Sequence, residues 1–375
     1  MSQTAQKSIS VGMVCPYSMR WPGGVQHHAL DLARALRVHN VHVDVFAPTD
    51  ETRRSAPAWT PPQDIRVVSL GNSIGISANG SVARLALGPR ACARVRKYLS
   101  EYDLVHIHEP FTPGVGLAAL TGARVPVIGT FHAAAQSHAG YRFGRLFLQR
   151  YWDRMVARIV VSDEAAALVC RYFGDDVTVL GNGVDVSRFQ KAVPLPVEEL
   201  SGGPAVFFLG RDEPRKGLDV LLSAFASVQE QLPAAVLWLA GPGTDVVQAE
   251  RLPPGTRTFG VVDDDLLARL FASAGVYCSP ARSGESFGIV LLEAMAAGTP
   301  VVASALPGYG AVARDKREAL LVPPDDPASL AEALVTILRD KDLSEQLVAA
   351  GRQRVEEFDW EVLSGRIADL YRSCL

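Results

Sequence analysis

Apolar positions along the chain follow two different spacings, and the change between them repeats from one end to the other. A short apolar run at 8–18 leads into a loop rich in proline and glycine, and apolar residues then recur every three to four positions over 25–38. An alternating run follows at 41–48. These spacings predict a strand, a helix and a second strand. Four more strands are predicted in this half, at 64–70, 103–110, 125–132 and 158–163.

The second half repeats this order of elements. Apolar runs predict strands at 204–209, 234–243, 256–262, 275–281 and 300–305. Helical spacing falls at 218–232, 264–274, 286–298 and 359–375. Strands that alternate with helices, with glycine-rich loops after the strands, predict parallel sheets covered by helices on both faces.

The predicted fold class is therefore α/β, with two doubly wound, Rossmann-like domains that face each other across a cleft. The first domain is expected at 1–188 and the second at 200–356, because the stretch 179–204 is rich in glycine and proline and has no periodicity. The last helix, 357–375, is expected to pack back on the first domain. Ligands of such sheets bind at the carboxyl ends of the strands, so the cleft is the expected site.

Composition narrows the class of protein. The 375 residues are 48 % hydrophobic and 21 % charged, and the net charge of −3 provides no basic field, so no nucleic-acid partner is expected. Five scattered cysteines without a C-x-x-C pair predict neither a disulfide framework nor a zinc site, which fits a reducing cytoplasm. The polar start and the lack of a long uncharged apolar run predict neither a signal peptide nor a membrane span.

The loop GRDEPRKG, residues 210–217, places five charged residues between two glycines at the end of a predicted buried strand. Two of its cations, Arg211 and Lys216, suit a diphosphate, and Asp212 and Glu213 could orient them. The alternative is a solvated loop whose charges pair with one another.

A second chemical motif is the apolar helix predicted within 283–302, which carries Glu285 ahead of it and Glu293 two turns along. Glu285 can accept hydrogen bonds from sugar hydroxyls, and Glu293 can reach a ribose diol. The alternative is that Glu285 only caps the helix, although a carboxylate in an apolar helix needs partners. Phosphate is expected to bind the backbone N–H groups of the first turn, those of Phe287, Gly288 and Ile289.

Two polar clusters allow more than one interpretation. The acidic triplet 263–265 resembles a metal-binding DxD pattern, but it precedes a helix and can cap it. His106 and His108 alternate on one strand face without an apparent third ligand, so we interpret them as strand-end residues, with His108 near the cleft. No metal site is predicted.

The stretch 85–99 predicts a basic amphipathic helix. Its cations are Arg90, Arg94, Arg96 and Lys97. Such a helix can lie on an anionic membrane surface, or it can be a solvated helix face.

The loop 210–217 and the helix at 285–298 together resemble the donor-site motifs of retaining glycosyltransferases of family 4, which have the two-domain GT-B fold. Other stretches narrow the resemblance to the phosphatidylinositol mannosyltransferases, which use GDP-mannose to begin the mannosylation of inositol lipids. The resemblance runs through nearly the whole chain. These stretches are CPYS at 15–18, PGGVQ at 22–26, NGSVARL at 79–85, HEP at 108–110, GTFH at 129–132 and NGVD at 182–185.

The resemblance implies four catalytic residues. Arg211 and Lys216 would hold the donor phosphates and neutralise the leaving GDP, and Glu285 would grip the donor sugar. His132 would contact the sugar near the reacting carbon. The mechanism implied is front-face attack, in which the departing phosphate oxygen takes the acceptor proton and no metal or other cofactor takes part.

The remaining donor-site residues are also implied by the resemblance. Gly23 and Gly24 would let the backbone approach the diphosphate. Asp264 would accept hydrogen bonds from the N1–H and amino groups of guanine, and Glu293 would bind the ribose. The first turn formed by 287–289 would bind phosphate.

On the acceptor side, Tyr17, Gln26 and Arg84 match family positions, and Arg84 is a position that contacts phosphate. The chain departs from the pattern elsewhere, with Phe111 in place of an asparagine and with Ala133 and Ser137 in place of a threonine and a lysine. Each lost contact to charge weakens binding by about 1–3 kcal/mol. Arg20, in place of an acidic residue, and His138 could compensate, so the acceptor is expected to be phosphatidylinositol or a related polyol.

The leading hypothesis is a retaining hexosyltransferase that moves mannose from GDP-mannose to an inositol-like hydroxyl. The first alternative is a family 4 enzyme that uses a UDP-sugar and a soluble cyclitol or natural-product intermediate. A binding protein without activity is disfavoured because all four catalytic residues are present, and a dehydrogenase because no G-x-G-x-x-G follows a strand. The expected location is the cytoplasm, with peripheral contact at the inner face of the membrane.

Overall fold

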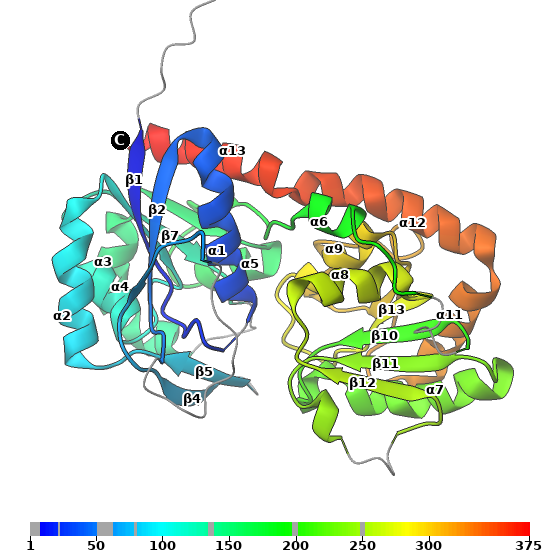
Figure 1. The fold of residues 1–375 in the computed structure, drawn as a ribbon. Coiled ribbons are helices and arrows are strands. Elements are labelled where there is room, and N and C mark those ends of the chain that lie inside the picture. The colour runs from blue at the N-terminus through cyan, green and yellow to red at the C-terminus, as the bar shows by residue number, and fades with distance from the viewer. Residues whose placement is uncertain are drawn as a thin grey trace, which may run out of the picture. The chain divides into compact units, whose positions relative to one another are not determined.

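The computed structural model describes residues 8–21, 23–50, 63–78, 81–133, 139–196, 202–247 and 252–375. The chain divides into two compact units (Figure 1): unit 1 comprises Met1–Gly183 and Trp360–Leu375, and unit 2 comprises Val184–Asp359. The first division lies at Gly183 and not at 188, because Val186 and Phe189 pack into the core of unit 2.

Unit 1 is built on a parallel sheet of seven strands in the order β3-β2-β1-β6-β7-β8-β9. A two-stranded antiparallel sheet, β4-β5, accompanies it. The strands are β1 (Ile9–Val14), β2 (Val41–Ala47), β3 (Val67–Ser69), β4 (Ile74–Ala78), β5 (Ser81–Leu85), β6 (Leu104–His108), β7 (Val127–Phe131), β8 (Ala157–Val160) and β9 (Thr178–Val179).

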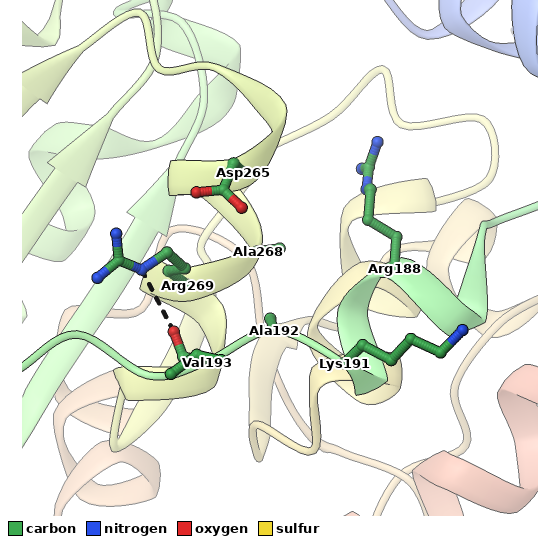
Figure 2. A pocket seen from close by; sticks show the side chains of 7 residues that line it. All are labelled: Arg188, Lys191, Ala192, Val193, Asp265, Ala268 and Arg269. Carbon is green, nitrogen blue, oxygen red and sulfur yellow. Dashed lines mark hydrogen bonds between the residues drawn. The ribbon is translucent and has the colours of Figure 1, made fainter.

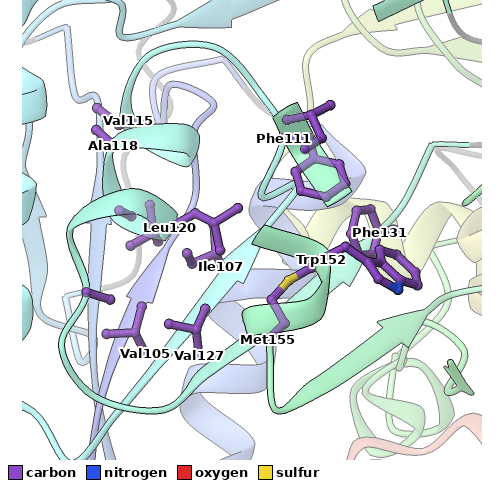
Figure 3. Packing of buried hydrophobic residues seen from close by; sticks show 14 of the residues in the cluster. Val105, Ile107, Phe111, Val115, Ala118, Leu120, Val127, Phe131, Trp152 and Met155 are labelled. Atoms are coloured by element: carbon purple, nitrogen blue, oxygen red, sulfur yellow. The ribbon is translucent and has the colours of Figure 1, made fainter. Parts of the chain in front are cut away.

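Helices cover both faces of this sheet because successive strand residues point to opposite sides. Two apolar clusters lie on the two faces of the sheet. On β1, Val11 and Met13 belong to the cluster that includes residues of α1 and α13, whereas Val14 belongs to the second cluster. Figure 3 shows that second cluster, in which Phe131 and Trp152 pack together. The helices are α1 (Gly24–Ala35), α2 (Pro89–Tyr98), α3 (Val115–Gly122), α4 (Ala139–Arg154), α5 (Asp163–Cys170) and α13 (Trp360–Ser373).

Unit 2 has a parallel sheet of six strands in the order β12-β11-β10-β13-β14-β15. Its central strands are short apolar runs that are buried on both faces, as expected for a parallel sheet between helices. The strands are β10 (Ala205–Leu209), β11 (Val236–Ala240), β12 (Thr256–Gly260), β13 (Val276–Ser279), β14 (Val301–Ser304) and β15 (Leu320–Val322).

The helices of unit 2 also lie on both faces: α6, α8 and α9 share one apolar cluster, and α7 and α11 share the other. Aspartates begin four of them, because a side-chain oxygen of Asp185, Asp263, Asp326 or Asp340 accepts an N–H of the first turn. The helices are α6 (Val186–Gln190), α7 (Leu218–Gln231), α8 (Asp264–Ser273), α9 (Ile289–Ala297), α10 (Pro307–Gly310), α11 (Pro327–Arg339) and α12 (Lys341–Val355).

The structure corrects several predicted elements. The helix predicted from 286 begins at Ile289, because Gly288 adopts a left-handed conformation with φ 97°. The helix predicted over 85–99 begins only at Pro89. The hairpin β4-β5, the strands β9 and β15, and the helices α3, α4, α5, α6, α10, α11 and α12 were not predicted. Among the described helices, none reaches the length and hydropathy of a bilayer span.

Candidate functional site

The predicted phosphate loop of unit 2 follows β10 and ends in a short turn, η4 (Pro214–Lys216), before α7. Gly217 closes this turn with φ 70°, and a Cβ there would overlap the carbonyl oxygen of Pro280. Only glycine fits both conditions without strain. The loop therefore places Arg211 and Lys216 at the carboxyl end of the central strand of the sheet, where ligands of such folds bind.

The charges of this loop pair within unit 2. One oxygen of Glu285, Oε1, accepts hydrogen bonds from Lys216 Nζ at 2.7 Å and from an Arg215 guanidinium nitrogen at 3.1 Å. Glu213 pairs with Arg215 at 3.0 Å and with Arg211 at 3.5 Å. The charges of the loop are therefore paired, as the alternative of a self-paired loop predicts. The same pairing joins the predicted residues Arg211, Lys216 and Glu285 in one network.

Arg215 is a member of this network that sequence reasoning missed. Its signal was present in the motif, because Arg215 is the third cation between the two glycines. The network holds three cations and two carboxylates, with side chains between 14 % and 31 % exposed. Such a network can present cations to a diphosphate while it remains neutralised in the absence of one.

The helix next to this loop starts differently from the prediction. Phe287 is buried, Gly288 precedes the first helical residue, and Ile289 is that residue. The first N–H groups of a helix have no partner within it, so the helix end that was predicted to bind phosphate lies at Ile289 and the residues that follow it. Glu293 lies half-buried on the second turn of α9.

The acidic triplet divides its roles. Asp263 is the cap of α8, since its carboxylate accepts the N–H of Leu266 at 2.8 Å. Asp264, predicted to bind the base of the donor, lies in the first turn and pairs with Arg188 at 3.2 Å. Its contact with a base stays a prediction.

A pocket that was not predicted opens between α6 and α8. It has a volume of about 530 Å³ and is shown in Figure 2. None of the predicted donor residues lines it. Its lining consists of Arg188, Lys191, Ala192, Val193, Asp265, Ala268 and Arg269.

Histidines gather in unit 1 at the carboxyl ends of β6 and β7. These strands pair in parallel with His108 opposite Thr130, which brings the ends of the two motifs together. His108 Nδ1 and His132 Nε2 share a hydrogen bond of 2.9 Å. His106 bonds Tyr371 Oη and Thr130 Oγ1, both at 2.6 Å.

A third ring packs against this pair. His28, from α1, lies edge-on to His108 and His132 with ring centroids 5.3 and 4.9 Å apart. The ring of Trp360 also lies edge-on to His28, with ring centroids 5.1 Å apart. One nitrogen from each of the three histidines lies within 4.8 Å of the others. Among the described residues, this is the one group of three His, Cys, Asp or Glu side chains close enough together to hold a metal ion. The interpretation of His106 and His108 as strand-end residues without a further partner was therefore incomplete.

Burial makes these histidines neutral. It lowers the pKa of His28 to about 4 and that of His106 to about 3, because the charged imidazolium would lose its hydration. Burial also holds the pKa values of His108 and His132 well below the ordinary value. His108, expected near a cleft, is fully buried, and His132 is 6 % exposed.

Glu109 is a further residue of this region that sequence reasoning missed. One of its carboxylate oxygens accepts the backbone N–H of His132 at 2.6 Å and that of Ala133 at 2.7 Å. Its φ is 50°, in the left-handed region that a side chain rarely adopts. Burial raises the pKa of this carboxyl, whereas the two N–H bonds lower it. A buried, strained glutamate thus holds the backbone of the predicted catalytic histidine.

The predicted acceptor residues lie around the loop between β1 and α1. Gln26 Nε2 donates to the carbonyl oxygens of Ser18 and Trp21, at 3.2 and 2.8 Å, so its amide holds this loop in place. The Arg84 guanidinium stacks over the ring of Trp21 at 4.1 Å. Asp50, also missed from the sequence, is fully buried and accepts the Ser18 hydroxyl at 2.6 Å.

The remaining predicted residues of this loop region differ in exposure. Tyr17 and Arg20 are half-buried, and burial raises the pKa of the Tyr17 phenol. Gly23 and Gly24 lie at the start of α1, where Gly23 is the cap.

Two predicted acceptor positions lie beside Glu109 and the aromatic core. Phe111 is 7 % exposed and packs against Phe131, Tyr141 and Phe173, so most of its ring belongs to the core. Ala133 is half-buried. Contact of either residue with an acceptor stays a prediction, and Ser137 and His138 lie outside the described residues.

The basic helix predicted at 85–99 is α2, and its four cations are exposed. Two of them also bind unit 1 itself. Arg94 donates to the carbonyl oxygen of Ser69 at 2.9 Å, and Arg96 donates to that of Ala118 at 3.2 Å. The charges of Arg90 and Lys97 complete the basic face.

Comparisons with known proteins identify the family. Residues 22–188 match the model of Glycosyltransferase Family 4, and residues 196–354 match the model of Glycosyl transferases group 1. The phosphatidyl-myo-inositol mannosyltransferase of Mycobacterium leprae is 41 % identical over 375 residues, which cover 97 % of this chain and 97 % of that protein. The D-inositol 3-phosphate glycosyltransferase of Streptomyces scabiei is 29 % identical, over 94 % of this chain and 87 % of that protein.

Solved structures share the fold. The HepE protein of Anabaena, solved with UDP-glucose, has a TM-score of 0.77 and 20 % identity, over 97 % of this chain and 100 % of that chain. Sucrose-phosphate synthase of Thermosynechococcus elongatus has a TM-score of 0.74 and 23 % identity, over 97 % of this chain and 98 % of that chain. The predicted fold class, two Rossmann-like domains of the GT-B type, is confirmed. Identity of 41 % over nearly the whole length shows that this chain belongs to family 4 of the glycosyltransferases, in the group of the phosphatidyl-myo-inositol mannosyltransferases, and is a hexosyltransferase.

Proposed function

We propose that the protein transfers mannose from GDP-mannose to a hydroxyl of an inositol-like acceptor, with retention of the anomeric configuration. The observation that carries this proposal is the 41 % identity to phosphatidyl-myo-inositol mannosyltransferases across the whole chain. The network of Lys216, Arg215 and Glu285 supports it, because two of the predicted donor residues, Lys216 and Glu285, are hydrogen-bonded to each other.

Unit 2 is proposed to hold the donor. Lys216 and Arg211 would bind the diphosphate, whose charge would replace Glu285 and Glu213 as their partner. Glu285, released from the cations, would then accept hydrogen bonds from the sugar hydroxyls. The start of α9 would bind phosphate, and Glu293 would bind the ribose.

The chemical step needs no nucleophilic residue in this proposal. The acceptor hydroxyl attacks the anomeric carbon on the face that GDP leaves, and a phosphate oxygen of the leaving GDP takes its proton. Lys216 and Arg211 lower the barrier because they neutralise negative charge as it develops on GDP. Enzymes of this family generally need no metal, and we propose none for this one.

Unit 1 is proposed to bind the acceptor. Its contacts would come from Tyr17, Arg20 and Arg84 around the loop that Gln26 holds, with Ala133 and the edge of Phe111 nearby. A polyol fits these groups, because phenol, guanidinium and backbone groups bind hydroxyl and phosphate oxygens.

Thermal unfolding in the presence of nucleotides tests the donor. GDP and GDP-mannose should raise the melting temperature without added metal, whereas UDP, ADP and dTDP with their sugars should not. A shift specific to UDP would contradict the guanine assignment and would favour the alternative of a UDP-sugar enzyme. Transfer of labelled mannose to phosphatidylinositol and to free inositol then identifies the acceptor.

Peripheral contact with an anionic membrane forms part of this proposal. Besides the basic face of α2, helix α4 exposes 79 % of Phe143, 93 % of Leu146 and 48 % of Phe147. Arginines alternate with these apolar groups along α4, and the guanidinium of Arg142 lies 4.7 Å from the ring of Phe143. Exposed apolar side chains among cations suit the boundary between acyl chains and anionic headgroups.

Vesicle cosedimentation tests this contact. The double variant Phe143→Ser and Leu146→Ser should lose at least 10-fold in binding to vesicles that contain phosphatidylinositol, because two apolar groups no longer enter the membrane. Val38→Ser is the matched control, since Val38 is 80 % exposed elsewhere in unit 1. Equal binding by both variants would exclude α4 from the contact.

A further inference from the structure

The histidine cluster of unit 1 contains an asymmetry that bears on how His132 meets a substrate. His108 Nδ1 and His132 Nε2 share one hydrogen bond, so one ring donates and the other accepts. Both rings are neutral, and each carries a single proton. The ring that donates in this bond decides which nitrogen of His132 carries the proton.

The second nitrogen of His108 distinguishes the two arrangements. His108 Nε2 is buried and has no hydrogen-bond partner. If His132 donated, His108 Nε2 would carry a proton and would be a buried N–H without an acceptor. If His108 donates from Nδ1, its Nε2 is a bare lone pair. Buried N–H groups without a partner are rarer than unpaired acceptors, so the second arrangement is favoured.

Asn182 provides an acceptor near His28 and His132. Its Oδ1 is a buried acceptor without a partner. Its side chain raises the pKa of both His28 and His132, as an acceptor near the two rings does by stabilising a protonated nitrogen. His132 Nε2 is already bonded to His108, so the nitrogen that can carry a proton toward another acceptor is Nδ1.

We propose that His108 is a positioning residue that holds His132 as the tautomer protonated at Nδ1, so that His132 meets the donor sugar as a hydrogen-bond donor and not as a base. Glu109 fixes the backbone of the same residue through its N–H. Two consecutive residues of the HEP motif thus set the position, orientation and protonation of His132. The tautomer follows from the cluster alone, whereas the contact with the sugar rests on the proposed function.

Nuclear magnetic resonance of the ring nitrogens tests the tautomer without a substrate. Protein labelled with ¹⁵N-histidine should show His132 protonated at Nδ1, the reverse of the preference of free histidine in water. Loss of the signal in His132→Gln assigns it. A His132 ring protonated at Nε2 in the unaltered protein would overturn the proposal.

A matched pair of variants tests the role of His108. Asparagine and leucine have nearly the same size and shape, but an asparagine amide at this position can donate a hydrogen bond from near the place of Nδ1. His108→Leu should release the tautomer and lower kcat about 10- to 100-fold with KM for the donor nearly unchanged. His108→Asn should keep the tautomer and recover most of this loss.

Tyr371→Phe is the control for general damage to the cluster. It removes the bond to His106 and leaves the bond between His108 and His132 in place, so the His132 signal should not change. Equal losses of kcat in His108→Leu and His108→Asn would contradict the proposal, because they would show that His108 acts through packing and not through its hydrogen bond. If the tautomer is found but no mannose is transferred from any donor, the positioning stands and the proposed function fails.

Discussion

The two units build their predicted sites in opposite ways. In unit 2, Arg211, Lys216 and Glu285 are partly exposed charges that neutralise one another. In unit 1, His108, Glu109 and His132 are buried, and neutral rings and backbone N–H groups are their partners. All eight histidines of the chain belong to unit 1, and none lies between 184 and 359.

The difference separates two requirements of catalysis. A site that must bind and release a charged nucleotide needs cations whose present partners can be replaced, and exposed ion pairs contribute little to stability. A site that must hold one ring in one orientation needs contacts that are costly to break, such as hydrogen bonds in a buried setting. Changes of pH and of single residues should therefore affect the two units differently.

Acid should produce the largest difference. A histidine whose folded pKa is lowered stabilises the fold above the unfolded value near 6.5, and this contribution is lost as the pH falls through that value. Below a pH of about 6.5, each buried histidine lowers the free energy of unfolding by about 1.4 kcal/mol per pH unit, until the pH reaches the pKa of that histidine in the folded protein. Unit 1 should therefore unfold first.

Other titrating groups change the stability of the units in other pH ranges. The raised pKa of Glu109 works in the opposite direction, because its contribution is present below the ordinary glutamate value and is lost as the pH rises. In unit 2, Asp219 and Asp326 have lowered pKa values and lose their contribution only below about 4. Hydrogen exchange measured by peptide between pH 7 and 4 resolves the units, and simultaneous loss of protection would contradict the comparison.

Loss of Lys216 should remove nearly all turnover. Lys216→Ala removes a cation proposed to neutralise the leaving GDP, and kcat should fall by about 100- to 1000-fold. Lys341→Ala is the matched control, because Lys341 is an 86 % exposed lysine of the same unit. Steady-state transfer assays check both variants. A kcat that Lys216→Ala lowers by less than about 10-fold would mean that the diphosphate assignment is wrong.

Loss of the Glu109 carboxylate should weaken unit 1 directly. Glu109→Ala leaves the N–H groups of His132 and Ala133 without their acceptor, at a cost of about 1–3 kcal/mol for each. Glu109→Gln keeps an acceptor oxygen and should cost less, although it removes the charge. Urea unfolding gives the free energies of unfolding, and equal values for the two variants would show that hydrogen bonding is not what this side chain contributes.

Asp264→Asn should have the smallest effect. Its ion pair with Arg188 involves a side chain that is 61 % exposed, so stability should change by less than about 1 kcal/mol. Under the guanine assignment, affinity for GDP should fall about 10-fold, since an amide replaces a carboxylate that accepts two hydrogen bonds. Calorimetric titration with GDP and UDP measures both affinities. An equal loss of affinity for the two nucleotides would show that Asp264 does not contact the base.

Strands with continuous apolar runs were predictable because they are buried on both faces, and β10 and β11 are examples. The elements that were missed carry mixed signals. Helix α4 contains Gly140, Gly144 and several exposed apolar residues, which obscure its helical face. The hairpin β4-β5 was missed although the sequence between its strands contains the dipeptide Asn-Gly, which is a common sequence signal for a hairpin.

The candidate site residues that the sequence suggests lie in short motifs. Lys216, Arg211 and Glu285 belong to motifs whose types already suggest phosphate and sugar. The histidine cluster depends on strand order, because it joins His28, His108 and His132 from three separate elements. Glu109 lies in a quoted motif, but only the backbone path from β7 shows that its carboxylate meets the N–H of His132.

Helix α13 has a consequence for the order of events during synthesis. It supplies Trp360 and Tyr371 to the histidine cluster, yet it follows the whole of unit 2 in the chain. At usual rates of translation, roughly 10 to 35 s separate residues 184 and 359. Throughout that time the face of unit 1 that α13 covers has no partner from its own chain. Unit 2, although it comes second, is therefore the first to have all of its residues available for folding.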